Sequence, residues 1–197
     1  MRFHYVPERV TAPAALPVSL ERVKAHCRVD HSEEDDLLTD LIGAATDHLD
    51  GWSGVLRRCL VSQAWSVSFD EFADVMRLPF PALTIESVTS LNAAGDETTA
   101  SPSGYALRRD TLGSFVERLT SAIWPAVSNE RQAVTVTFVA GYGDADDVPK
   151  AIQSALLLMI GDLYANRETA VIGLSASAIP MSTTVQRLLR PHSLVKV

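Results

Sequence analysis

The spacing of apolar residues changes twice along this 197-residue chain, and this change constrains the fold more than any other feature. Before residue 60, apolar residues recur at steps of three and four, as on one face of an α-helix. From Val61 to Phe69 they alternate with polar residues, which is the pattern of a half-buried β-strand. Helical spacing returns after Pro149. We therefore predict helices, then an inserted sheet, then helices.

The first helical part contains two predicted helices. One begins at Ser19, whose hydroxyl suits a helix start, and ends near Arg28. The second begins at Ser32, and four carboxylates follow at residues 33–36, where the helix dipole favours negative charge. We interpret this acidic run mainly as a helix start. The apolar stripe of the second helix consists of Leu38, Leu41, Ile42, Ala45, Leu49 and Trp52.

The middle of the chain is predicted to form a small, mostly antiparallel sheet. Besides Val61–Phe69, the predicted strands are residues 84–92, 105–108, 114–119 and 133–140, with a turn at residues 94–96.

The last helical part is unusually apolar. A helix is expected after Pro149, with Asp146 or Asp147 as its cap. Leu157 and Leu158 make it apolar nearly all round, so it is either a central core helix or also faces a neighbouring subunit. A small-residue loop at 172–181 and a short helix from Ser182 to Pro191 follow.

These elements predict an α+β fold, in which N- and C-terminal helices pack as one helical core around an inserted small antiparallel β-sheet subdomain. The core comprises residues 18–59 and 147–191, and the sheet subdomain comprises residues 60–146. Residues 1–17, with three prolines, are expected to form an extended arm that is ordered only on another surface. Residues 192–197 form a C-terminal tail, which either docks on a partner or has no partner.

Charge is distributed unevenly around a net charge of -7. Residues 1–147 carry 12 Lys and Arg against 22 Asp and Glu, whereas residues 148–197 carry 5 against 2. The acidic body disfavours tight binding to nucleic acid, which needs clustered basic residues. The longest apolar run, residues 155–161, is too short to cross a bilayer, and the N-terminus lacks the pattern of a secretory signal. A cytoplasmic product without a membrane partner is expected.

No group of reactive residues has a spacing that supports chemistry. His26 and His31 lie five residues apart across a helix end, which disfavours a zinc site that would include Cys27. Cys27 and Cys59 are expected to be free thiols. No GxSxG motif occurs, and scattered residues cannot define a catalytic triad. We predict no catalytic residue, no metal and no cofactor.

Three aspartates, Asp144, Asp146 and Asp147, follow a Gly-Tyr-Gly sequence. They could bind calcium, but the twelve-residue pattern with its closing glutamate is absent. A capped turn between a strand and a helix is the favoured interpretation.

An ordered series of residues, over about residues 18–191, carries a resemblance to a known family. The series is Leu20, Val23, Lys24, His26, Arg28, Val29 and Asp30, the acidic helix start, then Leu41, Ile42, Ala44, Ala45, Thr46, Gly54, Leu60, Gln63, Trp65, Leu78, Pro79, Pro81, Val88, Gly141, Tyr142, Pro149, Ile152, Ala155, Leu163, Tyr164, Asn166, Arg167 and Glu168. It resembles the head-tail connector (adaptor) proteins of tailed double-stranded DNA phages, prophages and gene transfer agents. Asp50 stands where this family would have glutamate.

The resemblance implies a non-catalytic subunit of a ring, commonly of about twelve copies. Such a ring lies under the portal protein of a filled capsid and links it to the stopper and tail, and DNA passes through it without specific binding. The protein would be cytoplasmic during assembly and then part of the particle neck. The sheet or its loops would face the tail side.

The resemblance also implies site residues. The expected portal-binding segment is Arg187, Leu188, Leu189, Arg190, Pro191, His192, Ser193, Leu194, Val195, Lys196 and Val197. Apart from the resemblance, the apolar helix after Pro149 suits side-by-side subunits, and the expected subunit-interface residues are Leu157, Leu158, Tyr164 and Arg167. Deleting residues 187–197 is predicted to leave the monomer folded and to abolish portal attachment.

Two alternatives stay open. The chain could be another neck or tail-completion protein, such as a stopper or tail terminator. It could also be an intracellular enzyme whose site has no recognisable motif.

Overall fold

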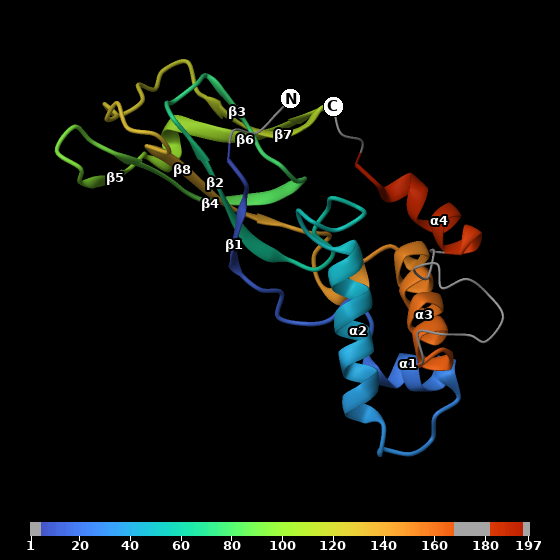
Figure 1. Cartoon of the computed structure of the whole chain (residues 1–197). Helices are drawn as coiled ribbons and strands as arrows, with labels where there is room; N and C mark the ends of the chain where they lie inside the picture. The colour runs from blue at the N-terminus through green and yellow to red at the C-terminus, as the bar shows by residue number, and fades with distance from the viewer. Residues whose placement is uncertain (1–4, 168–181, 195–197) are drawn as a thin grey trace, which may run out of the picture. The chain divides into compact units, whose positions relative to one another are not determined.

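The computed structural model describes residues 5–167 and 182–194, and these form two compact units (Figure 1). One unit, the helical unit, contains residues 15–61, 143–167 and 182–194. The other, the sheet unit, contains residues 5–14 and 62–142. Each unit is therefore built from segments that are distant in the sequence.

The helical unit is organised around α3, which contacts each of the other three α-helices (Figure 1). Its elements are α1 (Leu20–Cys27), α2 (Asp35–Leu49), η2 (Ala145–Asp147), α3 (Lys150–Ala165), α4 (Thr183–Leu189) and η3 (Arg190–His192). The core contains the apolar side chains of Val23, Leu38, Ile42, Leu49, Leu56, Ile152, Leu156, Ile160, Val185 and Leu189. The helical spacing in the sequence thus corresponds to real buried helix faces.

Two of the predicted helix starts are confirmed. The Ser19 hydroxyl oxygen accepts from Arg22 N at 3.4 Å, and the Ser182 hydroxyl oxygen accepts from Val185 N at 3.2 Å. Arg28 ends α1 in the left-handed region, with φ of 59°.

The predicted starts of α2 and α3 were wrong in detail. Helix α2 begins at Asp35 and not after Ser32, and no side chain caps it. Helix α3 is preceded by Pro149 in the cap position, while Asp144 and Asp147 form a capping box around η2. A proline closes the turn before α3, so neither Asp146 nor Asp147 caps that helix. The interpretation of the three aspartates as part of a capped turn is confirmed.

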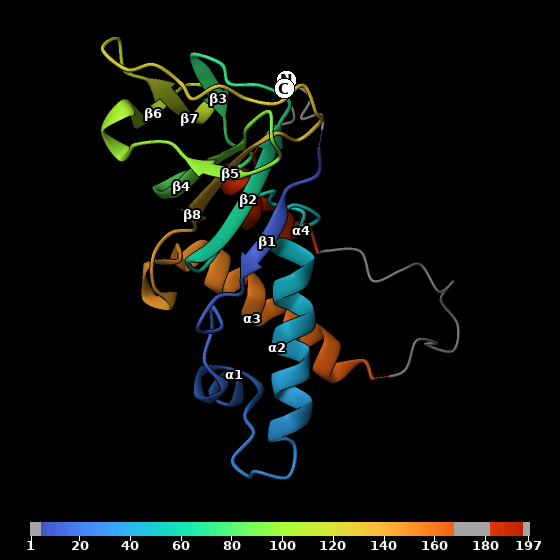
Figure 2. The same ribbon diagram turned by 90° about the vertical axis from the view of Figure 1, so that its left-hand side faces the viewer.

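The sheet unit contains two antiparallel sheets where a single one was predicted (Figure 2). Their strands are β1 (Glu8–Thr11), β2 (Gln63–Phe69), β3 (Val75–Arg77), β4 (Ala82–Leu91), β5 (Glu97–Thr99), β6 (Tyr105–Asp110), β7 (Gly113–Arg118) and β8 (Val134–Ala140). The larger sheet has the order β1-β2-β8-β4-β5, and the smaller one has the order β3-β7-β6. A 3₁₀ turn, η1 (Pro102–Gly104), precedes β6. The mixed helix and sheet content agrees with the predicted class.

All five predicted strands are present, whereas β1, β3 and β5 were not predicted. Each of the three has only three or four residues, which is too short for alternation to be recognised. Strand β1 lies within the predicted N-terminal arm. Its Glu8 pairs with Ser66 and its Arg9 pairs with Trp65, at the edge of the larger sheet. Residues 8–11 of the arm are therefore ordered by the chain's own sheet.

Aromatic residues fill the core of the sheet unit. The ring of Phe80 lies edge-on to Trp65, with centroids 4.9 Å apart. The centroid of Phe80 lies 6.5 Å from that of Phe138.

On the smaller sheet, Arg77 donates two hydrogen bonds to Asp110, at 2.8 and 2.6 Å. These bonds lower the pKa of Asp110 to about 2.

Within residues 5–167 and 182–194, no helix has the length and apolar character needed to cross a lipid bilayer.

Candidate interaction surfaces

The end of α3 is tied to the residue that precedes α2. The Tyr164 hydroxyl donates a hydrogen bond to one carboxylate oxygen of Glu34, and Arg167 Nη2 donates to the other at 2.7 Å. The Arg167 guanidinium carbon also lies 4.6 Å from the centre of the Tyr164 ring. These three residues, the Glu34 cluster, join parts of the chain that are 130 residues apart.

The hydrogen bonds of the Glu34 cluster change its titration. The hydroxyl of Tyr164, and then the guanidinium of Arg167, lower the pKa of Glu34. The same bond to Glu34 raises the pKa of Tyr164, because losing the proton would leave two negative oxygens in contact. Two predicted subunit-interface residues, Tyr164 and Arg167, therefore already have partners in their own chain.

The other two predicted interface residues lie on the same helix. Leu157 and Leu158 are half-buried on α3, beside Leu156 and Ile160, which are fully buried. Part of each of these two side chains therefore stays exposed on the helical unit.

The C-terminal segment is packed onto the helical unit as far as Leu194. Val185 and Leu189 of α4 are buried, and α4 contacts α3. Arg58 Nε donates to the carbonyl of His192 at 3.1 Å, and Leu194 N donates to the carbonyl of Leu56 at 3.1 Å.

The predicted C-terminal tail from residue 192 is thus held on its own chain as far as Leu194. Arg187, Arg190, Pro191 and Ser193 are exposed, Leu188, His192 and Leu194 are half-buried, and the side chain of Leu189 belongs to the core. The last three predicted portal-binding residues, Val195, Lys196 and Val197, lie outside the described residues, as does the predicted loop at 172–181.

The loop that follows α2 is closed by Asp50. This residue is 8% exposed, and its carboxylate accepts a hydrogen bond from Leu60 N at 2.7 Å. Gly51 N donates to the carbonyl of Arg58 at 3.0 Å across the same loop. At Gly54, an added Cβ atom would lie 2.3 Å from the carbonyl oxygen of Asp50, so only glycine fits there.

A buried glutamine holds the turn before α3. Gln153 is 1% exposed, and its amide nitrogen donates to the carbonyls of Ala145 and Val148 at 2.9 and 3.0 Å. Its oxygen accepts from Arg22 of α1 and from Lys150. Neither Asp50 nor Gln153 was predicted as a structural residue, since polar side chains in a helical pattern are ordinarily expected at the surface.

A comparison with known protein families matches a region that includes α2 and the Asp50 loop. Residues 17–76 match the family model of the phage gp6-like head-tail connector protein. The resemblance to head-tail connector proteins is confirmed. The matched region of this connector-like chain includes α1, α2, the Asp50 loop and β2.

Solved structures share the fold over nearly the whole chain. The chain is 23% identical to a protein in a structure titled "Neck of empty GTA particle computed with C6 symmetry", with a TM-score of 0.76, covering 98% of this chain and 97% of that one. It is 23% identical to a protein in the virion of a native gene transfer agent (GTA) particle, with a TM-score of 0.74 and the same coverage. A native GTA neck computed with C12 symmetry gives 22% identity, a TM-score of 0.69 and again the same coverage. No curated protein matches the sequence.

The candidate metal ligands of the connector-like chain do not gather into a site. His31 Nδ1 lies 2.7 Å from Glu33 Oε2, and His26 lies near Gly161 of α3. Within residues 5–167 and 182–194, no group of three or more His, Cys, Asp or Glu side chains is arranged to hold a metal ion. Cys27 and Cys59 are free cysteines, and burial raises the pKa of Cys27.

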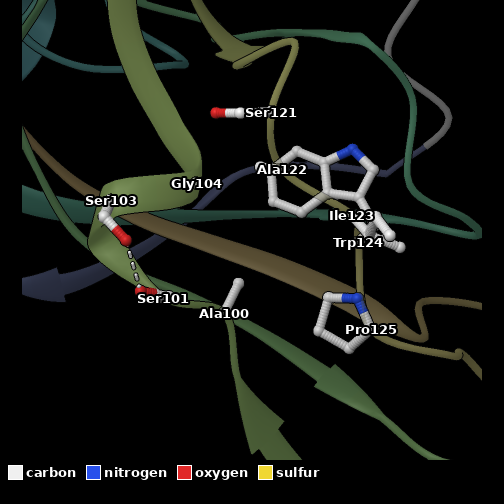
Figure 3. A pocket seen from close by; sticks show the side chains of 9 residues that line it. All are labelled: Ala100, Ser101, Ser103, Gly104, Ser121, Ala122, Ile123, Trp124 and Pro125. Carbon is white, nitrogen blue, oxygen red and sulfur yellow. Dashed lines mark hydrogen bonds between the residues drawn. The ribbon is translucent and has the colours of Figure 1, made fainter.

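A shallow pocket of about 300 Å³ lies in the sheet unit (Figure 3). It is lined by Ala100, Ser101, Ser103, Gly104, Ser121, Ala122, Ile123, Trp124 and Pro125. The Trp124 ring stacks on Phe72 with centroids 4.5 Å apart, and its Nε1 donates to the carbonyl of Ala73 at 3.1 Å. The lining has no charged side chain and no acid-base pair, so the pocket does not support a catalytic role.

Proposed function

We propose that this chain is a structural head-tail connector (adaptor) subunit. Copies of it form a ring between the portal of a DNA-filled capsid and the stopper or tail, and DNA passes through the channel of the ring. The family match over residues 17–76 carries the proposal, because it includes the helix pair and the Asp50 loop. A structural, non-catalytic role follows from this family.

The fold likeness to particle necks supports the ring. The similar structures were computed with six-fold and twelve-fold symmetry, which are symmetries of closed assemblies. A closed ring repeats one heterologous interface, so each subunit needs two different surfaces that fit each other. We propose about twelve copies and assembly in the cytoplasm, followed by residence in the particle neck.

We propose that α3 contributes to the interface between subunits through Leu157 and Leu158. Both leucines are half-buried in the isolated chain, so a neighbour could remove more of their surface from water. Tyr164 lies at the end of the same helix and Arg167 lies two residues beyond it, and the exposed part of Arg167 would contribute at the rim. In this arrangement the helical core supplies the contacts of the ring, and the inserted sheet unit faces the tail side.

We propose that the C-terminal segment, residues 187–197, binds the portal. Its positive charge and its position at the end of a packed helix support this role. Because residues up to Leu194 are packed on their own chain, portal binding would depend on exposed positions and on Val195, Lys196 and Val197.

Pull-down with the portal protein of the same particle tests the portal contact. The full chain should retain the portal, and a variant that lacks residues 195–197 should retain less while keeping its circular dichroism spectrum. No retention by the full chain would favour the alternative of a stopper or tail terminator. Electron microscopy of the particle neck tests the role itself, and a position of this protein away from the portal would refute the proposed function.

A further inference from the structure

One face of α2 carries a line of carboxylates. At 100° per residue, Asp36, Asp40 and Asp47 lie within about 40° of one another, opposite the buried Leu38 and Ile42. All three aspartates are exposed. Gly43 and Ala44 lie beside this line, and the space next to Gly43 is open, so another chain can approach the helix closely. We call this face the acidic stripe.

Part of the acidic stripe destabilises the helix that carries it. Asp36 lies at the favourable end of the helix dipole, but Asp47 lies in the last turn, where a carboxylate is unfavourable. Asp36 and Asp40 are four residues apart, so they repel each other. Among the described residues, none of the three aspartates forms an ion pair. Positive charge from another chain would offset the unfavourable position of Asp47 and the repulsion between Asp36 and Asp40.

A matching positive face lies on α4 and the residue that follows it. Val185 and Leu189 are buried, and Arg187 points to the opposite side of the helix. Arg190 continues the helical backbone, with φ of -49° and ψ of -43°, and is exposed on the same outer side. Neither arginine forms an ion pair within the described part of the chain. We call Arg187 and Arg190 the basic stripe.

The two stripes fit each other in charge and in spacing. Asp36 and Asp40 are about 6 Å apart along the axis of α2, and Arg187 and Arg190 are about 4.5 Å apart along theirs. Both helices belong to the helical unit and pack on α3 with their opposite faces. The stripes are therefore two different, complementary surfaces on one compact unit of the chain, as a heterologous interface requires.

We propose that the acidic stripe of one subunit binds the basic stripe of a second copy of this chain. The inference rests on the ring of the proposed function and names surfaces through which the ring closes. It assigns Arg187 and Arg190 to the neighbouring subunit, and it thereby narrows the portal contact proposed above from residues 187–197 to residues 191–197. These ion pairs set the order and direction of subunits, and the half-buried leucines of α3 supply apolar contact.

Complementary charge reversal tests the proposal with the full-length chain. One variant combines Asp36→Lys with Asp40→Lys, and the other combines Arg187→Glu with Arg190→Glu. Sedimentation velocity over a concentration series should show self-association weakened about tenfold or more for each variant alone, because each reversal places like charges opposite one another. An equimolar mixture should recover association close to the wild type, because each reversed stripe then meets its complement on the other variant.

The matched control combines Asp30→Lys with Asp146→Lys. Both residues are exposed in the helical unit, and this change adds the same charge as the reversal on α2. If the control weakens association as much as Asp36→Lys with Asp40→Lys, or if the mixture fails to recover, the proposed contact is wrong.

Two further outcomes distinguish a failure of the proposed contact from a failure of the proposed ring. If the wild type associates and both reversed variants associate equally well, the stripes are not the interface and the ring stands. If the wild type stays monomeric at every concentration, the result counts against the ring and therefore against this contact.

Discussion

At the scale of single residues, two buried polar side chains fix the local backbone of the helical unit through hydrogen bonds. Asp50 closes the loop after α2, and Gln153 holds the turn before α3. Each satisfies backbone groups that would otherwise be buried without a hydrogen-bond partner. Losing such a partner costs more than the bond contributes, because the remaining group has been removed from water.

Replacing Asp50 by alanine should lower the free energy of unfolding by about 2 kcal/mol, since the Leu60 amide would lose its acceptor. Urea denaturation followed by circular dichroism measures the change. Asp50→Asn keeps an acceptor oxygen and should cost less. The exposed Asp47→Ala is the matched control and should stay within about 0.5 kcal/mol of the wild type. Equal losses for Asp50 and Asp47 would contradict the role of Asp50.

The Glu34 cluster predicts a pH-dependent contribution to stability. The pKa of Glu34 is lowered below 4.5 in the folded chain, so its contribution is present above pH 4.5 and is lost as the pH falls through the lowered pKa. Tyr164→Phe removes the hydroxyl donor and should reduce this contribution.

Denaturation of the wild type and Tyr164→Phe at a series of pH values measures the effect. The difference between the two proteins should be largest near neutral pH and should shrink on acidification. Tyr105→Phe, in the sheet unit and outside the Glu34 cluster, serves as the control. A difference between wild type and Tyr164→Phe that does not change with pH would show that the hydroxyl acts independently of the Glu34 charge.

At the scale of elements, segments near both ends of the chain prove to be parts of the folded units. The N-terminal arm contributes β1 to the larger sheet, and the C-terminal segment contributes α4 to the helical core. Both segments are short and have weak local signals, so their order comes from the surfaces they pack on. Truncating the chain before residue 187 would therefore remove Leu189 from the core, and the earlier expectation of an unaffected fold no longer holds.

Leu189→Ala should destabilise the helical unit by about 2–4 kcal/mol, because the side chain is 3% exposed and its removal leaves a cavity. Thermal or urea unfolding provides the measurement. Arg187→Ala, on the exposed side of the same helix, is the matched control and should have little effect on the monomer. If both variants unfold like the wild type, α4 does not pack on α3 as described.

At the scale of the whole molecule, the net charge of -7 bears on the proposed channel. Like charges on protein and DNA prevent tight contact at short range, which suits a wall that DNA must pass. About half of the positive charges lie in the pairs at 57–58 and 108–109 or in the C-terminal part, and several of the others are engaged in ion pairs. This distribution of charges does not predict a broad basic surface.

The wild-type chain should bind double-stranded DNA at physiological salt no more tightly than ordinary non-specific binders, whose dissociation constants are about 10⁻⁴ to 10⁻⁶ M. Fluorescence anisotropy with a labelled duplex measures this. Arg187→Glu with Arg190→Glu serves as a more acidic comparison. Tight binding that these changes abolish would assign the basic stripe to DNA and contradict the channel proposal.

The sequence alone was sufficient for features that depend on neighbouring residues. Ser19 and Ser182 cap their helices, and the alternating residues of Val61–Phe69 and residues 133–140 form central strands, because capping and periodicity act over a few residues. The family resemblance followed from the same ordered residues. The short strands β1 and β3 could not be predicted, since each is held by pairing with a strand distant in the sequence. Strand β5 pairs with the preceding strand β4, but its three residues are too few for alternation to be recognised.

The candidate surfaces required the tertiary structure. Spacing identified the apolar character of α3, but not that Tyr164 and Arg167 meet Glu34 130 residues away. It identified the charges of α2 and α4, but not that both helices pack on α3 with their charged faces outward. Local sequence sets which side of a helix is apolar, whereas chain folding sets what that side packs against, because distant contacts depend on the path of the whole chain.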